Sequence, residues 1–137
     1  MVMRRSGSKD AVALMPEYDA TQTDATLALL HFFSGAHLLD KEVWGDATTA
    51  ALMRGIMMGT LENRPFDTGA LANHLRIPHQ TVVRRVNQME DRGLIRKRKN
   101  GRRYELTATD KGLSIGMDRN KDYIDLVRRT LSPGFST

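Results

Sequence analysis

The sequence predicts a mainly α-helical protein with one small β-hairpin. Three observations lead to this fold class. Apolar residues recur at helical spacing along most of the chain, a tight turn joins two short helical segments, and Asn100-Gly101 separates two strand-like runs. The 137 residues are enough for one core but too few for two ordinary domains. We therefore expect a single domain over residues 21–137, preceded by a loosely ordered arm at 1–20.

The first two predicted helices are strongly apolar. Asp24 can cap a helix over 24–39, and apolar side chains cover nearly its whole circumference. Because a domain this small can scarcely surround its own first helix, we expect a second subunit to cover it. The next helix begins at 46 or 48 and ends at 62. Its Gly55 and Gly59 are spaced so that a neighbouring backbone can approach closely.

A helix-turn-helix arrangement follows. Thr68 is a suitable N-cap for a short helix that ends near Arg76, and Ile77-Pro78 then makes a tight turn. Pro78 suits the first position of a helix over 79–92, which stops at Gly93.

The second of these helices has one apolar and one polar face. Val82, Val86 and Met89 recur at helical spacing and define the buried face. The opposite face carries side chains that can form paired hydrogen bonds with base edges in a major groove: Gln80, Arg84, Asn87 and Gln88, with Val83 at the margin. Any amphipathic surface helix also has polar residues outside, so this face alone leaves both interpretations open. Arg85 lies beside the buried face, where it could reach a phosphate or pair with an acid.

Residues 95–99 and 102–107 are expected to form a hairpin around Asn100-Gly101, the dipeptide typical of a two-residue type I′ turn. In that register Lys99 opposes Arg102, Lys97 opposes Tyr104 and Ile95 opposes Leu106. The base of the hairpin is then apolar and its tip cationic. Like charges facing each other at the tip are unfavourable, which indicates an external partner such as phosphate.

Positive charge is concentrated in the same part of the chain. Residues 76–103 contain ten basic and two acidic residues, a local net charge of +8, which leaves −3 for the rest of the chain. This distribution favours polyanion binding. The alternative is a solvated basic surface without a nucleic-acid partner.

The last predicted helix runs over 110–130. Apolar residues follow one side of it and could complete a dimer interface together with helix 24–39: Leu113, Met117, Ile124, Val127 and Leu131.

Composition excludes several kinds of function. Without cysteine there is no disulfide, thiolate metal site or cysteine nucleophile, and we expect a cytoplasmic protein. The apolar run at 11–15 is too short for a signal peptide, and Arg54 interrupts the longest apolar stretch, so no membrane partner is expected. The spacings of the histidines do not suit a metal, and the sequence has neither paired carboxylates in an apolar setting nor a glycine-rich phosphate loop. We expect no enzyme activity, metal or cofactor.

From Thr68 to Gly112 the sequence resembles the winged-helix domain of MarR-type transcription regulators. The resemblance is carried by Leu71-Ala72, Leu75, Thr81-Val82-Val83-Arg84, Glu90-Asp91-Arg92-Gly93-Leu94-Ile95 and Thr109-Asp110-Lys111-Gly112. It departs from the usual pattern at Pro78, at Arg85 and in its short wing. It implies a winged helix-turn-helix fold with a DNA-binding core at about 47–110 and dimerisation helices at about 24–39 and 110–131. By the same resemblance Gln80, Thr81, Val83 and Arg84 match groove-facing positions, and Arg102 matches the wing arginine.

These observations predict a sequence-specific DNA-binding transcription regulator that acts as a homodimer. Helix 79–92 would enter the major groove of double-stranded DNA, and wing 95–107 would contact the minor groove or the backbone. The predicted DNA-binding residues are His79, Gln80, Thr81, Val83, Arg84, Asn87, Gln88, Arg98, Lys99, Arg102 and Arg103. The alternatives are a winged-helix protein-interaction module and an RNA-binding domain. A small-molecule effector, often found in MarR-like regulators, is not identified by any polar cluster in the sequence.

Overall fold

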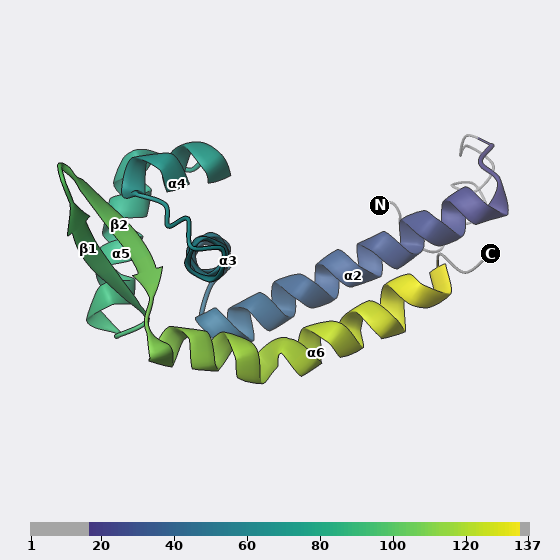
Figure 1. Ribbon diagram of the computed structural model, residues 1–137. Coiled ribbons are helices and arrows are strands. Elements are labelled where there is room, and N and C mark those ends of the chain that lie inside the picture. Colours follow the sequence, from purple (N-terminus) through teal and green to yellow (C-terminus); the bar gives the residue numbers. More distant parts are fainter. Residues whose placement is uncertain (1–16, 135–137) are drawn as a thin grey trace.

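Figure 1 shows the computed structural model of the protein, which describes residues 17–134. The described elements follow the chain in the order α2 (Ala20–Trp44), α3 (Ala47–Leu61), α4 (Thr68–Leu75), α5 (His79–Asp91), β1 (Ile95–Asn100), β2 (Arg103–Ala108) and α6 (Asp110–Gly134). The expected fold class, mainly helical with one hairpin in a winged helix-turn-helix order, is confirmed. Most of the predicted N-terminal arm, residues 1–16, lies outside the described residues.

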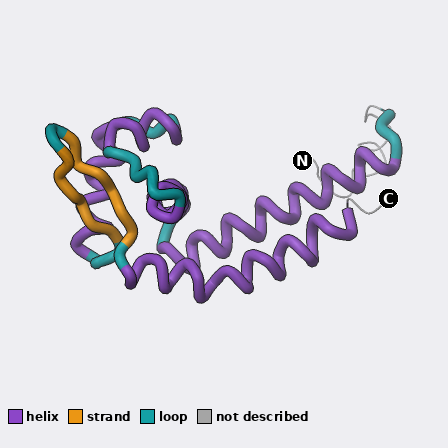
Figure 2. Tube along the Cα trace, in the orientation of Figure 1, coloured by secondary structure: helices purple, strands orange, loops and turns teal. Residues whose placement is uncertain are grey.

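The helices form two groups (Figures 1 and 2). α2 and α6 lie side by side and project away from a compact group made by α3, α4, α5 and the hairpin. Each of the two long helices has 25 residues, which corresponds to about 37 Å at 1.5 Å per residue. We call the pair of helices α2 and α6 the arm, as distinct from the predicted N-terminal arm at residues 1–20. Among the described helices, none combines the length and apolarity needed to cross a membrane.

The core lies in the compact group, around α3. Side chains from α3, α4, α5 and the base of the hairpin are no more than 2% exposed there: Leu52, Met53, Ile56, Leu71, Val82, Val86, Met89, Leu94, Ile95 and Leu106. The predicted buried face of α5 is therefore confirmed. Packing the apolar stripe of α5 against α3 and the hairpin leaves its polar face directed outward.

The ends of α2 differ from the prediction. The helix begins at Ala20 because Asp19, and not Asp24, is the N-cap, and Asp19 and Gln22 form a reciprocal capping box. It continues past Leu39 to Trp44 and ends at Gly45, which has φ 97°. α3 begins as expected, with Asp46 as its N-cap.

Three other helix ends are corrected by local hydrogen bonding. Asp67 caps α4 by accepting a hydrogen bond from the Ala70 N–H at 2.7 Å, so Thr68 is the first helical residue and not the cap. Pro78 is the N-cap of α5 and not its first helical residue. α6 continues beyond Thr130 to Gly134.

Two glycines permit close backbone packing. A Cβ on Gly59 would lie 2.9 Å from the Arg64 carbonyl oxygen, which confirms the close approach expected on α3. A Cβ on Gly112 would lie 2.2 Å from the Leu94 carbonyl oxygen. α6 can therefore begin directly against Leu94, which lies between α5 and β1, only because residue 112 has no side chain.

Candidate nucleic-acid interface

α5 presents the predicted polar face to solvent. On this helix His79, Gln80, Val83, Arg84, Asn87 and Gln88 are exposed, and Thr81 is half-buried. Val83 is 38% exposed, so this surface also includes an apolar side chain. Because the buried stripe fixes the rotation of α5, these residues form one continuous face.

One of these residues has an internal partner. The Asn87 side-chain oxygen accepts a hydrogen bond from the Lys97 ammonium group of β1. Lys97 also lies 3.6 Å from a carboxylate oxygen of Glu90, and its backbone N–H donates to that carboxylate at 3.2 Å. Lys97 therefore attaches the hairpin to α5. The amide NH₂ of Asn87 stays available for an external acceptor, and its oxygen keeps one lone pair for an external donor.

The hairpin register differs from the prediction. Ile95 pairs with Ala108, Lys97 with Leu106, Lys99 with Tyr104 and Asn100 with Arg103, so the two-residue loop is Gly101-Arg102 and not Asn100-Gly101. Gly101 has φ 65°, whereas Arg102 has no positive φ. A positive φ at only the first loop position is typical of a type II′ turn, which favours glycine there.

Contacts at the base of the hairpin explain this register. The Leu106 N–H donates to the Phe66 carbonyl at 2.8 Å, and Asp67 forms a β-bridge with Glu105, so the segment before α4 holds β2 in place. Cross-strand partners still combine an odd with an even position, and each face keeps its predicted members. The expected Lys99–Arg102 like-charge pair does not form, because Tyr104 faces Lys99 and Arg102 lies in the loop.

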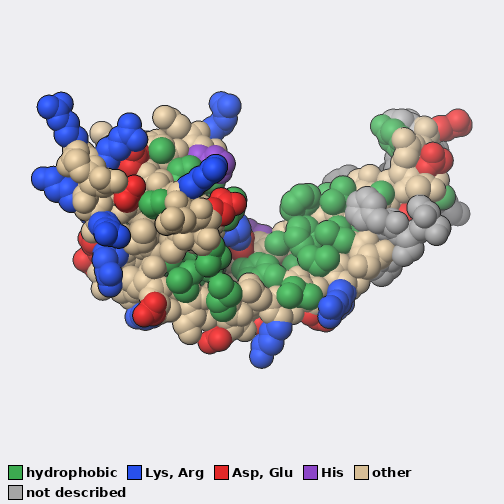
Figure 3. Space-filling model, viewed as in Figure 1, with side chains coloured by type: hydrophobic (Ala, Val, Ile, Leu, Met, Phe, Trp, Pro, Cys, Tyr) green, Lys and Arg blue, Asp and Glu red, His purple; other side chains and the backbone are tan. Residues whose placement is uncertain are grey.

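The hairpin tip is cationic as predicted. Arg98, Lys99, Arg102 and Arg103 are all exposed. Figure 3 shows Lys and Arg side chains projecting around the hairpin and α4, on the end of the molecule away from the arm. The Nε of Arg103 lies 3.6 Å from a carboxylate oxygen of Asp67, the α4 cap, a spacing that leaves most of its guanidinium in solvent.

Arg85 pairs with an acid, which settles the question left open by the sequence. Its Nη1 donates to the Asp46 carboxylate at 2.7 Å and so joins α5 to the start of α3. Burial works against the charge of Asp46, but hydrogen bonds from Thr49 and the Arg85 guanidinium outweigh it and hold the pKa of this carboxyl below its ordinary value. The Nε of Arg85 is buried and has no hydrogen-bond partner among the described residues.

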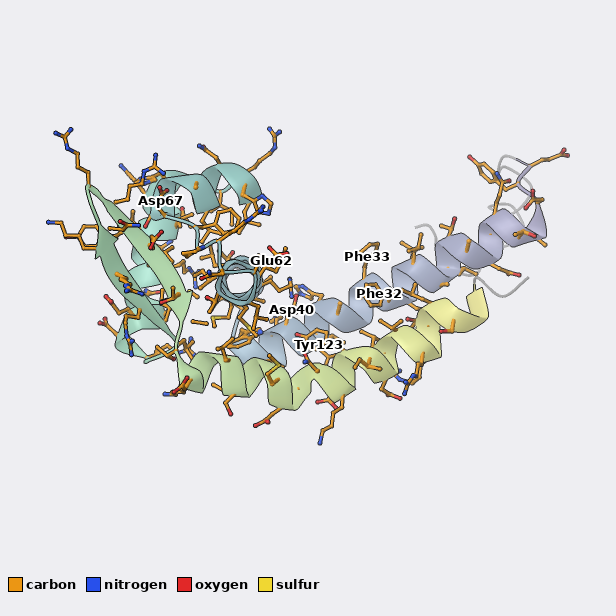
Figure 4. The ribbon with its side chains drawn as sticks, viewed as in Figure 1. Phe32, Phe33, Asp40, Glu62, Asp67 and Tyr123 are labelled. Atoms are coloured by element: carbon orange, nitrogen blue, oxygen red, sulfur yellow. The ribbon has the colours of Figure 1, made fainter. Side chains whose placement is uncertain are left out.

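A second ion-pair cluster, centred on the buried Asp40, connects the arm to the compact group. Asp40 of α2 accepts two hydrogen bonds from the Arg54 guanidinium of α3, at 2.8 and 3.0 Å, and one from the Tyr123 hydroxyl of α6 at 2.7 Å. Figure 4 shows Asp40 and Tyr123 close together, with Phe33 on the opposite side of α2. We call Asp40, Arg54 and Tyr123 the hub. The sequence did not predict it, although Arg54 within an apolar helix and a carboxylate near the end of α2 were visible.

Ionisation in the hub follows from these contacts. Burial disfavours the charged form of Asp40, yet the hydrogen bonds from Arg54 and Tyr123 together outweigh it, so the pKa of Asp40 is lowered. Burial, and then the hydrogen bond to Asp40, raise the pKa of Tyr123. Hence the hub contains an ion pair and a neutral phenol at neutral pH.

The arm exposes a broad apolar surface (Figure 3). On α2, Leu27, Leu30, Phe33 and Leu38 are 49–67% exposed, and on α6, Met117, Ile124 and Val127 are 37–49% exposed. Of the predicted α6 stripe, Leu113 and Leu131 are half-buried. Between the two helices Ala28 of α2 and Leu126 of α6 are buried instead, and Leu126 packs against Gly35 of α2.

Comparison with known proteins shows that part of the chain is similar to one sequence family. Residues 55–103, about a third of the chain, match the model of the MarR family. They run from α3 to the first residue of β2 and include the whole of α5. Among curated proteins no sequence gives a match. The resemblance to MarR-type winged helix-turn-helix regulators is thus confirmed over residues 68–103, whereas its last part, residues 104–112, lies outside the matched range.

Solved structures match over nearly the whole chain. A MarR transcriptional regulator from Methanosarcina mazei is 15% identical, with a TM-score of 0.58 over 94% of this chain and 85% of that one. A MarR family transcriptional regulator from Streptomyces coelicolor, solved in complex with DNA, is 18% identical, with a TM-score of 0.56 over 90% of this chain and 81% of that one. At these identities the likeness establishes the fold, arm included.

Proposed function

We propose that the protein is a sequence-specific DNA-binding transcription regulator that acts as a homodimer. The observation that carries this proposal is the joining of two surfaces. The exposed polar face of α5 and the cationic hairpin form one surface, and Lys97 holds them together through Asn87 and Glu90. A helix with such a face fits the major groove, and an adjoining basic hairpin fits the phosphates beside it.

Within this surface the residues have different roles. Gln80 and Arg84 are suited to paired hydrogen bonds with base edges, and Val83 to contact with a thymine methyl group. His79, Gln88, Arg98, Lys99, Arg102 and Arg103 supply contacts to phosphates or groove edges, while Thr81 lies at the margin of the face. Arg102 lies at the tip of the hairpin, because it belongs to the two-residue loop.

The exposed apolar surface of the arm supports the proposed dimer. Its exposed leucines and Phe33 form an apolar surface that this chain does not cover within the described residues. A second copy is the occupant we propose, because a twofold axis would bring the same apolar surface of two protomers together and cover both. Such a dimer presents two α5 helices at a fixed separation. α3 to β2 would act as the DNA-binding unit, at about 47–110, and α2 and α6 as the dimerisation unit.

Selection from a pool of random duplexes tests specificity and symmetry together. The proposal expects an enriched pseudo-palindrome whose half-sites are one helical turn apart or a multiple of it. Sedimentation at micromolar concentration should give a dimer. Duplex binding without any enriched motif would contradict sequence specificity, and preferential binding to single-stranded or hairpin RNA would favour the RNA alternative.

Ligand control is proposed at a cavity of about 280 Å³ beside the hub. Trp44, Met57, Met58, Leu61 and Tyr123 line it, and Arg54 borders it. A small apolar molecule there would contact α3 and α6 at once and could shift the arm relative to α5. Trp44 is the single tryptophan of the chain, so titration with two compounds that do not emit in the tryptophan range, cyclohexanol and benzoate, should change its fluorescence. Unchanged fluorescence and unchanged DNA affinity with both compounds would remove this part of the proposal.

A further inference from the structure

The turn between α4 and α5 contains an arginine in an unusual backbone conformation. Arg76 is the C-cap of α4 and has φ 55° and ψ 44°, in the left-handed region. Only one other non-glycine residue of the described chain has a positive φ, Asn63. Asparagine tolerates this region through local hydrogen bonding, whereas an arginine gains nothing comparable. Glycine would fill the position without strain, and helix-turn-helix turns often contain it.

The fold makes no use of the Arg76 side chain. It is exposed, and within residues 17–134 its guanidinium takes part in no ion pair or hydrogen bond. Arg54, Arg85 and Arg119, by contrast, each reach a carboxylate. The strained backbone therefore supports a positive charge that no described group of this protein neutralises.

The position of Arg76 indicates what neutralises it. It lies three residues before His79, where the exposed face of α5 begins. In a helix-turn-helix complex the first helix crosses the DNA backbone while the N-terminal residues of the second contact base edges. The turn that joins them then lies over phosphates at the edge of the groove. Improved solubility would not explain the residue, because a basic side chain at a neighbouring unstrained position would serve equally well.

We propose that Arg76 is a further DNA-contact residue, which binds a backbone phosphate and so sets how α5 is seated in the groove. The inference rests on the proposed function and adds to it a residue outside the polar face and the hairpin. A phosphate contact carries no base preference of its own, so its loss should weaken binding to all duplexes alike.

The test uses four variants of the full chain: Arg76→Gly, Arg76→Ala, Arg76→Lys and Asn63→Gly. The first two remove the same charge, and only glycine also relieves the backbone. Arg76→Gly should therefore unfold roughly 2–5 °C above Arg76→Ala. On duplex DNA, Arg76→Gly should weaken binding roughly 5- to 50-fold at 0.1 M salt. The log–log salt slope should become less steep by about 1.8 for a dimer that loses two phosphate contacts.

The other variants are matched controls. Arg76→Lys keeps the charge and should keep most of the affinity and the wild-type salt slope. Asn63→Gly relieves a similar backbone conformation at the end of α3 and should leave DNA affinity unchanged.

The outcomes separate this inference from the proposed function. Wild-type protein that binds no duplex refutes the proposed function and the inference with it. Wild-type protein that binds, with Arg76→Gly of equal affinity and slope, overturns the inference alone. So would Arg76→Ala as stable as Arg76→Gly, or a loss confined to the preferred duplex.

Discussion

Removal of Arg54 tests how much the hub stabilises the junction between the arm and the compact group. Arg54→Met keeps an unbranched apolar stem but leaves the Asp40 carboxylate, 7% exposed, without the guanidinium that donates two hydrogen bonds to it. Breaking a fully buried pair costs about 3–5 kcal/mol. The Arg54 side chain is 53% exposed, so water replaces part of the lost interaction, and we expect a loss of about 2 kcal/mol.

The pH dependence of this loss identifies its source. Because the folded-state pKa of Asp40 lies below the ordinary value of 3.8, its ionised form contributes stability that is complete above about pH 3.8. That contribution disappears as the pH falls through the folded-state pKa. Protonated Asp40 makes no ion pair, so the difference between wild type and Arg54→Met should shrink between pH 7 and pH 3.

Urea denaturation followed by circular dichroism measures both quantities, at one fixed protein concentration because dimerisation would otherwise shift the midpoints. Tyr123→Phe is the control, because it removes one hydrogen bond to Asp40 and keeps the ion pair; it should cost about 1–2 kcal/mol. The reasoning fails if Arg54→Met lies within about 0.5 kcal/mol of wild type at pH 7. It also fails if the penalty is the same at both pH values.

Three further predictions follow from the same structure. Phe33→Asp should abolish the dimer by placing an unpaired charge in the proposed interface. Tyr104→Asp, which changes a similarly exposed side chain outside the arm, should leave the dimer intact. Equal sedimentation of the two variants would argue against the arm as the interface. Arg84→Ala should cost about 1–3 kcal/mol of affinity for the preferred duplex and relax base preference, while Lys99→Ala should weaken binding to all duplexes equally. Fluorescence anisotropy with preferred and shuffled duplexes distinguishes these variants. For Arg84→Ala, an equal loss of affinity for preferred and shuffled duplexes would contradict a base contact. Gly112→Ala should cost more than about 2 kcal/mol, because its Cβ would meet the Leu94 carbonyl oxygen at 2.2 Å. Gly101→Ala has open space and should cost about 1–2 kcal/mol through its positive φ. A melting temperature of Gly112→Ala at or above that of Gly101→Ala would refute the packing argument.

Periodicity predicted α5 well because its three core residues recur about one helical turn apart. Val82, Val86 and Met89 determine the rotation of the helix, and the rotation determines which polar residues are exposed. The start of α2 was harder to predict. Two aspartates precede its apolar run, and only the reciprocal bonds between Asp19 and Gln22 show which of them caps the helix.

Features that depend on contacts between distant segments were not predictable. The hairpin turn was placed one residue early because Asn-Gly is a strong local signal, while the register is held by the pairing of β2 with residues 66 and 67. The hub joins residues that are 14 and 83 positions apart. Arg85 could be placed beside the buried face of α5, but its partner, 39 residues earlier, became known only from the fold.

Salt-dependent binding to a selected duplex is the decisive measurement for a DNA-binding surface made by α5 and the hairpin. Selection should enrich a pseudo-palindrome, and the protein should bind it as a dimer. The log–log salt slope should be about −0.9 for each phosphate neutralised, and with several contacts per protomer the slope is steep. A pool without any enriched motif, or an affinity for DNA that does not change with salt, would contradict the assignment of α5 and the hairpin as a DNA-binding surface.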